Sequence, residues 1–217
     1  MDVSGLPAEL LRAVSINRLE PYVSICGDAR RGLSVYLWNV SLCEAMYPAL
    51  HCCEIALRNS MYETLSEHFG NRDWIFDRRY LVKRDGDTIA GVMRRLEDYG
   101  KPLTPDNVMA ELTLGFWSTM LSASYDARYW RSPGLLRRLF PNAPRSELNI
   151  ARLHRQLNHL RNFRNRIFHQ EPVWNRSDLA RNRDDCYRFA EWISVEWSNR
   201  FRKIDRFDEI YLFCPVI

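Results

Sequence analysis

Apolar residues recur at steps of three and four through most of the chain, and no other feature of the sequence constrains its fold as strongly. One such series, between residues 49 and 70, consists of Leu50, Cys53, Leu57, Met61 and Leu65. Steps of this kind place side chains on one face of an α-helix. The alternation typical of a strand extends no further than the terminal run EIYLF, residues 209–213. The sequence therefore predicts an all-α fold, a bundle of helices.

Proline, glycine and capping residues indicate where these helices begin and end. Gly70 is a suitable C-terminal stop, and Pro48 is expected to kink or restart a helix. Thr104, Pro105 and Asp106 give three agreeing start signals. Residues 71–83 have no sustained period and are expected to form a connector. The expected helices cover residues 34–48, 49–70, 87–99, 104–122, 135–140, 146–170 and 177–204.

The length of 217 residues suits one domain with its own core. Residues 1–30 are expected to form an N-terminal arm or capping helix, and residues 31–217 a single all-α domain. No apolar run approaches the roughly 18 residues that cross a bilayer, and the first residues lack a basic region followed by an apolar core. We therefore expect a cytoplasmic protein that does not bind membranes.

The cysteines and the charges exclude some classes of site and permit others. Six cysteines without a CxxC pair favour buried reduced thiols over a disulfide framework or a zinc site. The net charge is only +4, but nearly all basic residues are arginine. Arginine offers a planar fork for phosphate, so an RNA partner is permitted. A GC-rich coding sequence that prefers arginine codons explains the same bias.

The expected helix at residues 146–170, which Ser146 would cap and Pro172 would end, carries two stripes. The apolar stripe consists of Leu153, Leu157, Leu160 and Ile167. The polar stripe consists of His154, Asn158, Arg161, Asn165 and His169. Asn165 and His169 are direct neighbours one turn apart. Arg164 lies about 140° round the helix from His169, and its long side chain is expected to bring the guanidinium back toward the imidazole.

Cleavage of RNA by its own 2′-hydroxyl requires the chemistry that this set provides. His169 can transfer protons near neutral pH, because an unperturbed histidine has a pKa of about 6.5. Arg164 can bind the scissile phosphate and stabilise its developing charge. Asn165 can orient the imidazole or donate to a phosphate oxygen. No metal and no cofactor is required. The alternative is a solvated helix end, where histidine and arginine interact favourably with the helix dipole.

The segment LRNFRNRIFHQEP, residues 160–172, resembles the R-x4-6-H motif of the HEPN superfamily. The surrounding chain resembles its Abi-like, or abortive infection, branch. Two further stretches match that branch: LHCCEIALRNSMYETLSEHFG, residues 50–70, and LTPDNVMAELTLGFWSTMLS, residues 103–122. Together the matching regions cover most of residues 34–175, in the expected order.

The resemblance implies an HEPN-like helical bundle with additional helices, and a homodimer whose motif helices face each other across a cleft. It implies a metal-independent endoribonuclease that leaves 2′,3′-cyclic phosphate, with Arg164, Asn165 and His169 as catalytic residues. Its RNA would be tRNA, mRNA or rRNA, and its role phage defence or growth arrest, with a possible antitoxin partner. Related toxins that their antitoxins adenylylate have tyrosine where this chain has Glu171, so that control is not expected.

Five further residues are candidates for binding RNA or supporting the cleft. Arg161 and Asn162 repeat the Arg–Asn pair one turn earlier, at a distance from the histidine that suits a phosphate contact but not the motif. Glu54 and Arg58 form either a plain surface pair or part of the cleft, with Glu54 orienting an arginine and Asn59 contacting RNA.

Five aromatic residues offer faces on which bases can stack, although packing in the core is the stronger expectation for most of them: Phe116, Trp117, Tyr125, Tyr129 and Trp130. Two other functions remain open. One is a non-catalytic HEPN-type RNA-binding or regulatory dimer, and the other is an α-helical scaffold for protein partners.

Overall fold

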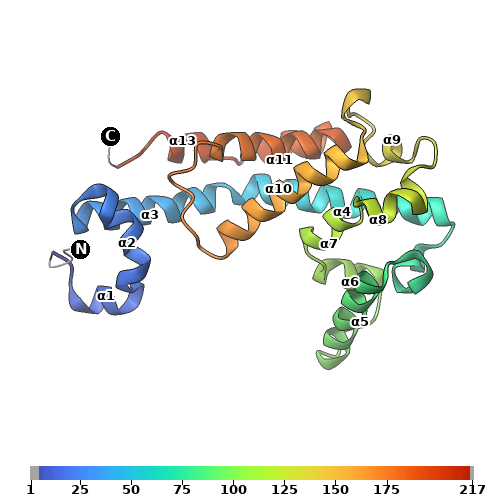
Figure 1. The fold of residues 1–217 in the computed structure, drawn as a ribbon, viewed down its shortest axis with the longest axis horizontal. Coiled ribbons are helices and arrows are strands. Elements are labelled where there is room, and N and C mark those ends of the chain that lie inside the picture. Colours follow the sequence, from blue (N-terminus) through green and yellow to red (C-terminus); the bar gives the residue numbers. More distant parts are fainter. Residues whose placement is uncertain (1–4, 216–217) are drawn as a thin grey trace.

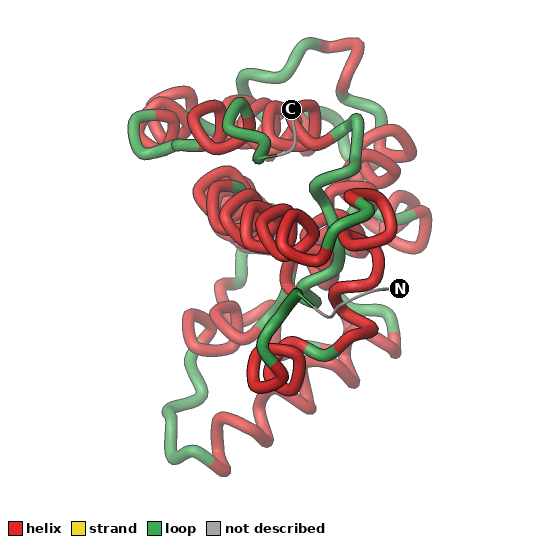
Figure 2. The backbone as a smooth tube through the Cα atoms, turned by 90° about the vertical axis from the view of Figure 1, so that its left-hand side faces the viewer, coloured by secondary structure: helices red, strands yellow, loops and turns green. Residues whose placement is uncertain are grey.

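The computed structural model describes residues 5–215, and within this range every regular element is helical (Figures 1 and 2). The central helix is α4 (Tyr47–Phe69), which packs against α7 (Leu114–Thr119), α9 (Leu135–Leu139), α11 (Leu179–Ile193) and α12 (Val195–Arg202). Because these neighbours surround it, α4 buries residues on several sides, many of them small. The prediction of an all-α fold is confirmed.

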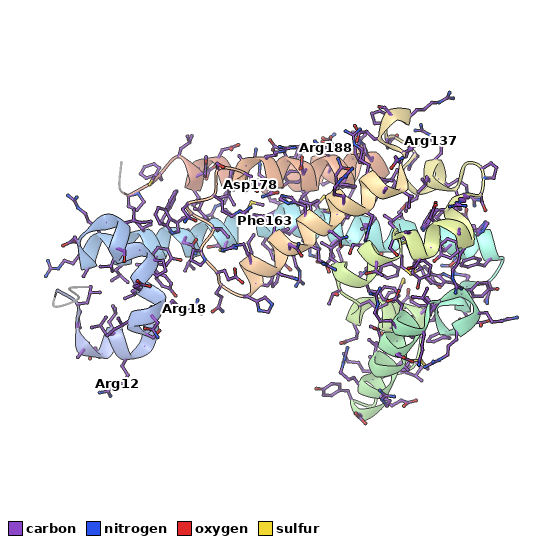
Figure 3. All side chains as sticks on the ribbon, in the orientation of Figure 1. Arg12, Arg18, Arg137, Phe163, Asp178 and Arg188 are labelled. Carbon is purple, nitrogen blue, oxygen red and sulfur yellow. The ribbon has the colours of Figure 1, made fainter. Side chains whose placement is uncertain are left out.

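The predicted motif helix is α10 (Ile150–Phe168), which crosses in front of α4 and α11 in Figure 1 and packs against α7 and α11. Its apolar stripe is buried, together with Phe163 (Figure 3). The expected cap at Ser146 is wrong, because the side chain of Asn149 accepts the N–H of Arg152 at 3.0 Å. The helix ends at Phe168, with His169 as its C-terminal cap.

The N-terminal segment forms α1 (Ala8–Val14) and α2 (Ile16–Cys26), and α2 packs against α3 (Ala29–Ala45). The contact is close at Gly32, where a Cβ atom would lie 2.8 Å from the Cα atom of Val23. Helix α1, in contrast, buries none of its residues. The division of the chain near residue 30 stays a prediction.

Helix α4 begins next to Pro48 and stops at Gly70, whose φ is +63°, as the sequence indicates. Helix α5 (Lys83–Asp98) projects away from the other helices in Figure 1. Thr104 caps α6 (Pro105–Glu111) by accepting the N–H of Asn107 at 3.2 Å. The remaining short helical segments are η1 (Arg72–Phe76), η2 (Arg78–Tyr80), α8 (Ala123–Tyr125), η3 (Asp126–Trp130) and η4 (Arg145–Glu147).

Two predicted long helices are each divided in the structure. The helix expected for residues 104–122 stops at Glu111, and α7 begins at Leu114 because its N–H donates to the carboxylate of Glu54 at 2.9 Å. The helix expected for residues 177–204 stops at Ile193, and Ser194 caps α12. Both divisions turn the chain back toward α4.

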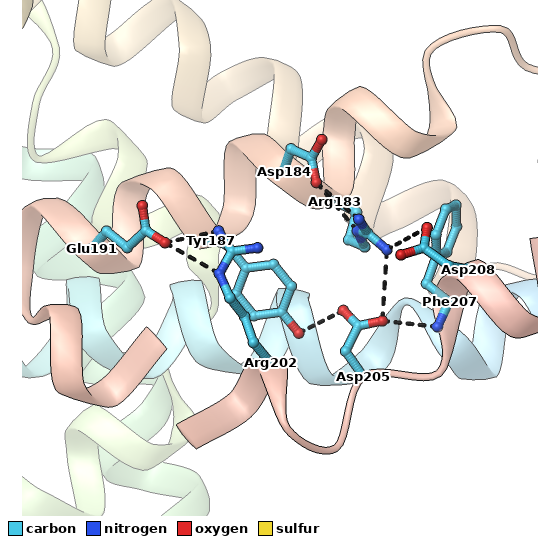
Figure 4. Close-up of polar contacts among 8 residues, drawn as sticks. All are labelled: Arg183, Asp184, Tyr187, Glu191, Arg202, Asp205, Phe207 and Asp208. Carbon is cyan, nitrogen blue, oxygen red and sulfur yellow. Dashed lines mark hydrogen bonds and ion pairs between the residues drawn. The ribbon is translucent and has the colours of Figure 1, made fainter. Parts of the chain in front are cut away.

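The terminal run with strand-like alternation lies mostly in α13 (Phe207–Tyr211), which packs against α3. Figure 4 shows the polar contacts that join α11 to this end of the chain. The hydroxyl of Tyr187 donates to Asp205 at 2.6 Å, and Arg183 forms an ion pair with Asp208 at 2.8 Å. Tyr187 is buried, and burial is the main reason that its pKa is raised.

The five candidate aromatic residues are all buried, with at most 6% of any of them exposed. Their expected place in the core is therefore confirmed, and they offer no free face on which a base could stack. The cysteines are free thiols, as expected, and three of them are buried: Cys52, Cys53 and Cys186.

Candidate functional site: a pocket beside the motif helix

A pocket of about 200 Å³ lies between α4 and α10, and we call it the Arg164 pocket. Helix α4 contributes Tyr47 and three further polar side chains to it, and α10 contributes an arginine and an aromatic ring. The residues with functional groups here are His51, Glu54, Arg58, Arg164 and Phe168. The structure therefore brings together candidate residues from residues 50–70 and residues 160–172, which are about 100 positions apart in the chain.

Arg164 is held in this pocket on two sides. Its guanidinium carbon lies 3.9 Å from the centre of the Phe168 ring, which is a cation–π contact. On the other side, Arg164 Nε lies 3.5 Å from Glu54 Oε2, an ion pair without hydrogen-bond alignment. The side chain keeps 23% of its surface exposed. Arg164 is thus packed on two sides, with its Nε buried, and within residues 5–215 its terminal nitrogens donate no hydrogen bond.

Glu54 joins three helices through one carboxylate. Its Oε1 accepts the N–H of Leu114 at 2.9 Å, and its Oε2 faces Arg164. The expected alternative, a plain surface pair between Glu54 and Arg58, is wrong, because Glu54 is engaged elsewhere. Arg58 instead donates to Asn59 Oδ1 at 3.3 Å. Arg58 lines the Arg164 pocket, whereas Asn59 lies exposed outside it.

His169 and Asn165 lie exposed at the end of α10, outside the lining of the Arg164 pocket. The backbone N–H of His169 donates to the carbonyl of Asn165 at 2.8 Å, which closes the last turn of the helix. The guanidinium of Arg164 is directed toward Glu54 and Phe168, and its approach to the imidazole stays a prediction. Within one protomer, Arg164 therefore lines the Arg164 pocket, whereas Asn165 and His169 lie outside its lining.

The N-terminal half of the polar stripe faces α7 and has a structural explanation. His154 Nε2 lies 2.7 Å from Asn158 Nδ2, and Asn158 Oδ1 accepts from the hydroxyl of Ser118 at 3.4 Å. Burial lowers the pKa of His154, and the charge of Arg161 lowers it further. The charged form of His154 is therefore disfavoured beside α7.

Arg161 and Asn162 lie one turn before the motif pair. Arg161 Nη2 donates to Asn162 Oδ1 at 3.4 Å, and Asn162 is exposed. Arg161 Nε is buried without a hydrogen-bond partner among the described residues. Arg161 lines a second pocket rather than the Arg164 pocket.

The loop after His169 is anchored by residues from the start of the chain. Gln170 has a φ of +59°, and its carbonyl accepts from Arg18 Nη1 at 2.9 Å; Arg18 projects from α2 in Figure 3. Buried Asn39, from α3, accepts the N–H of Val173 at 2.7 Å and that of Trp174 at 3.0 Å. Sequence reasoning missed Arg18 and Asn39, since no pattern links them to residues more than 130 positions away.

His51 is a further residue of the Arg164 pocket that sequence reasoning missed. It lies one turn before Glu54 on α4, and its ring stacks on that of Phe201 with 5.5 Å between centroids. The signal was present in the sequence, because positions 51, 54 and 58 share one face of a helix.

These features define an all-α protein with a partly buried arginine pocket beside the end of a long helix. Neither a family model, nor a curated protein, nor a solved structure matches this chain. Within residues 5–215, no group of three or more histidine, cysteine, aspartate or glutamate side chains is arranged to hold a metal ion. No helix in this range combines the length and apolar character needed to span a bilayer.

Proposed function

We propose that this protein is a metal-independent endoribonuclease of the HEPN, Abi-like type, acting in the cytoplasm in phage defence or as a growth-arresting toxin. The observation that carries the proposal is the setting of Arg164. It is packed against Glu54 and Phe168, on the same helix whose end presents an exposed histidine, His169. The resemblance of residues 160–172 to the R-x4-6-H motif supports the same conclusion.

The reaction is an attack of the RNA 2′-oxygen on the adjacent phosphorus, with breakage of the bond from phosphorus to the 5′-oxygen. His169 accepts the 2′-hydroxyl proton or supplies the proton that the leaving 5′-oxygen takes up. Arg164 binds the phosphate, and its hydrogen bonds strengthen as negative charge builds on the equatorial oxygens. The products are a 2′,3′-cyclic phosphate and a 5′-hydroxyl.

The proposal includes a homodimer, because within residues 5–215 no hydrogen bond joins Arg164 to His169, and the partners of Arg164 are Glu54 and Phe168. Exposed apolar side chains on α3, α4 and α10 support such an interface. Val40, Tyr47 and Phe168 are each about half exposed, at 49%, 53% and 47%. A site completed by two protomers loses activity on dilution below the dimer dissociation constant.

The test is incubation of the purified protein with total RNA and tRNA in excess EDTA, followed by analysis of the 3′ ends. The wild type should cut and leave cyclic phosphate, while His169→Ala should lose at least about 10²-fold in rate, the usual contribution of a general acid or base. His68→Ala is the matched control, because His68 is an exposed histidine near the end of α4. Folded, dimeric wild-type protein that cuts no RNA offered would refute the proposal.

The alternative function is an RNA-binding or regulatory dimer of the same type that does not cut. The ion pair of Arg164 with Glu54 favours it, because this pair directs the guanidinium away from the imidazole. The same samples separate the two functions. A binder retains RNA affinity and shows no His169-dependent cleavage under any condition.

A further inference from the structure

A second pocket, of about 420 Å³, lies next to the Arg164 pocket. Helices α5, α7 and α10 and the chain between α6 and α7 form its walls, and we call it the Arg161 pocket. Leu112 lines both pockets, so the two hollows adjoin at this residue. The Arg161 pocket has no part in the proposed cleavage chemistry.

Arg161 is aimed into this second pocket by the way its side chain is packed. Its aliphatic stem lies on α7 at Gly115, where an added Cβ atom would be 3.3 Å from Arg161 Cδ. Its guanidinium has one long hydrogen bond, to Asn162, and a buried Nε without a partner among the described residues. The terminal nitrogens of this guanidinium therefore keep donor capacity for an acceptor that enters the pocket.

The carboxylates of the Arg161 pocket are already engaged. Asp85 is buried, accepts from the hydroxyl of Tyr125 at 2.8 Å and pairs with Arg84 at 3.0 Å. Glu111 lies 3.7 Å from the ammonium of Lys101.

Arg95 of α5 also lines the pocket and is exposed. Like Arg161, it forms no ion pair with a carboxylate of residues 5–215. Two positive charges therefore remain for an anion.

We propose that the Arg161 pocket binds a nucleotide of single-stranded RNA next to the scissile phosphate, with its phosphate on Arg95 and Arg161. This inference rests on the proposed function. Arg161 and Arg164 are three residues apart on α10, a rise of about 4.5 Å. A strand that passes over Leu112 therefore places successive phosphates on the two arginines. The hydroxyls of Thr88 and Thr119, at the pocket wall, donate to the carbonyls of Arg84 and Gly115, so each can still accept a hydrogen bond from the ribose or base.

The experiment measures binding of a fluorescein-labelled single-stranded RNA by anisotropy, in the His169→Ala background so that the strand stays intact. Arg95→Ala is compared with Arg94→Ala, which removes the same charge from the next residue of α5, exposed but outside the pocket. Arg95→Ala should weaken binding about fivefold to tenfold and reduce the slope of log affinity against log salt by about 0.7. Arg94→Ala should change affinity less than twofold.

Equal effects of Arg94→Ala and Arg95→Ala on RNA affinity and salt slope would refute the proposal that the Arg161 pocket binds single-stranded RNA. Tighter binding of a duplex of the same sequence would also refute it. If the wild type cleaves RNA and the two variants lose the same RNA affinity, RNA binding in the Arg161 pocket is refuted, but the proposed nuclease activity is not. If Arg95→Ala alone loses RNA affinity and the wild type cleaves no RNA, RNA binding in the Arg161 pocket is supported and the proposed nuclease activity is refuted. Absence of all RNA binding refutes both.

Discussion

Replacing Asn39 by alanine tests how the loop after the motif helix is held. One side-chain oxygen of Asn39 accepts the N–H groups of Val173 and Trp174, at 2.7 and 3.0 Å. The alanine variant leaves both donors without this acceptor. Since Val173 has no exposed surface, water cannot reach its N–H group in the folded state.

The expected loss follows from the two burial states. A fully buried donor left unsatisfied is unfavourable by about 1–3 kcal/mol, and a half-buried hydrogen bond contributes about 0.5–1.5 kcal/mol. The free energy of unfolding should therefore fall by about 3 kcal/mol. For a chain of this size, each kcal/mol lowers the melting temperature by about 2–4 °C, so the midpoint should fall by roughly 6–12 °C.

The assay is urea denaturation followed by circular dichroism, with thermal melts as a second measurement. Asn199→Ala is the matched control, because Asn199 is exposed on α12 and its loss should change stability by less than about 0.5 kcal/mol. If Asn39→Ala is as stable as this control, the two hydrogen bonds do not anchor the loop and the reasoning is wrong.

Two further predictions concern this loop and the helices that support it. Gln170→Gly should raise the free energy of unfolding by about 1 kcal/mol, because glycine adopts the positive φ of +59° without a Cβ penalty; urea denaturation checks this, and Gln170→Ala, which keeps the penalty, should show no gain. Burial raises the pKa of Tyr22 to about 12 from 10.0, so its contribution to stability is complete below pH 10 and is lost as pH rises through 12. Tyr22→Phe should therefore lose less stability than the wild type between these pH values, whereas the exposed control Tyr99→Phe should behave as the wild type; equal pH dependence in all three proteins would contradict the cause assigned to the shift.

Sequence patterns predicted those helices and helix ends that depend on residues close together in the chain. The apolar stripe of α10, the cap at Thr104 and the stop at Gly70 each depend on residues within one or two turns. The break before α7 depends instead on Glu54, which lies 60 positions before Leu114 in the chain. No spacing rule within residues 104–122 contains that carboxylate, so the sequence favoured one continuous helix.

The candidate site was likewise predicted where it depends on spacing within one helix, but not where it depends on packing between helices. Spacing placed Asn165 and His169 on one helix face, and the expectation that Glu54 orients an arginine agrees with its ion pair to Arg164. The direction of the Arg164 guanidinium depended on packing against Phe168 and an ion pair to another helix, which spacing does not contain. The position of the Arg164 guanidinium relative to His169 was therefore not predictable from α10 alone.

The contacts between the start and the end of the chain determine when the protein can fold during its synthesis. The indole N–H of Trp38 donates to the carbonyl of Ile210 at 2.8 Å, across 172 positions. Helix α4 is covered by α11 and α12, which leave the ribosome long after it. Contacts of such sequence separation form late. The newly made chain therefore cannot cover α4 or pair Trp38 with Ile210 until residues 179–210 have been synthesised, so α4 leaves the ribosome before the helices that bury it.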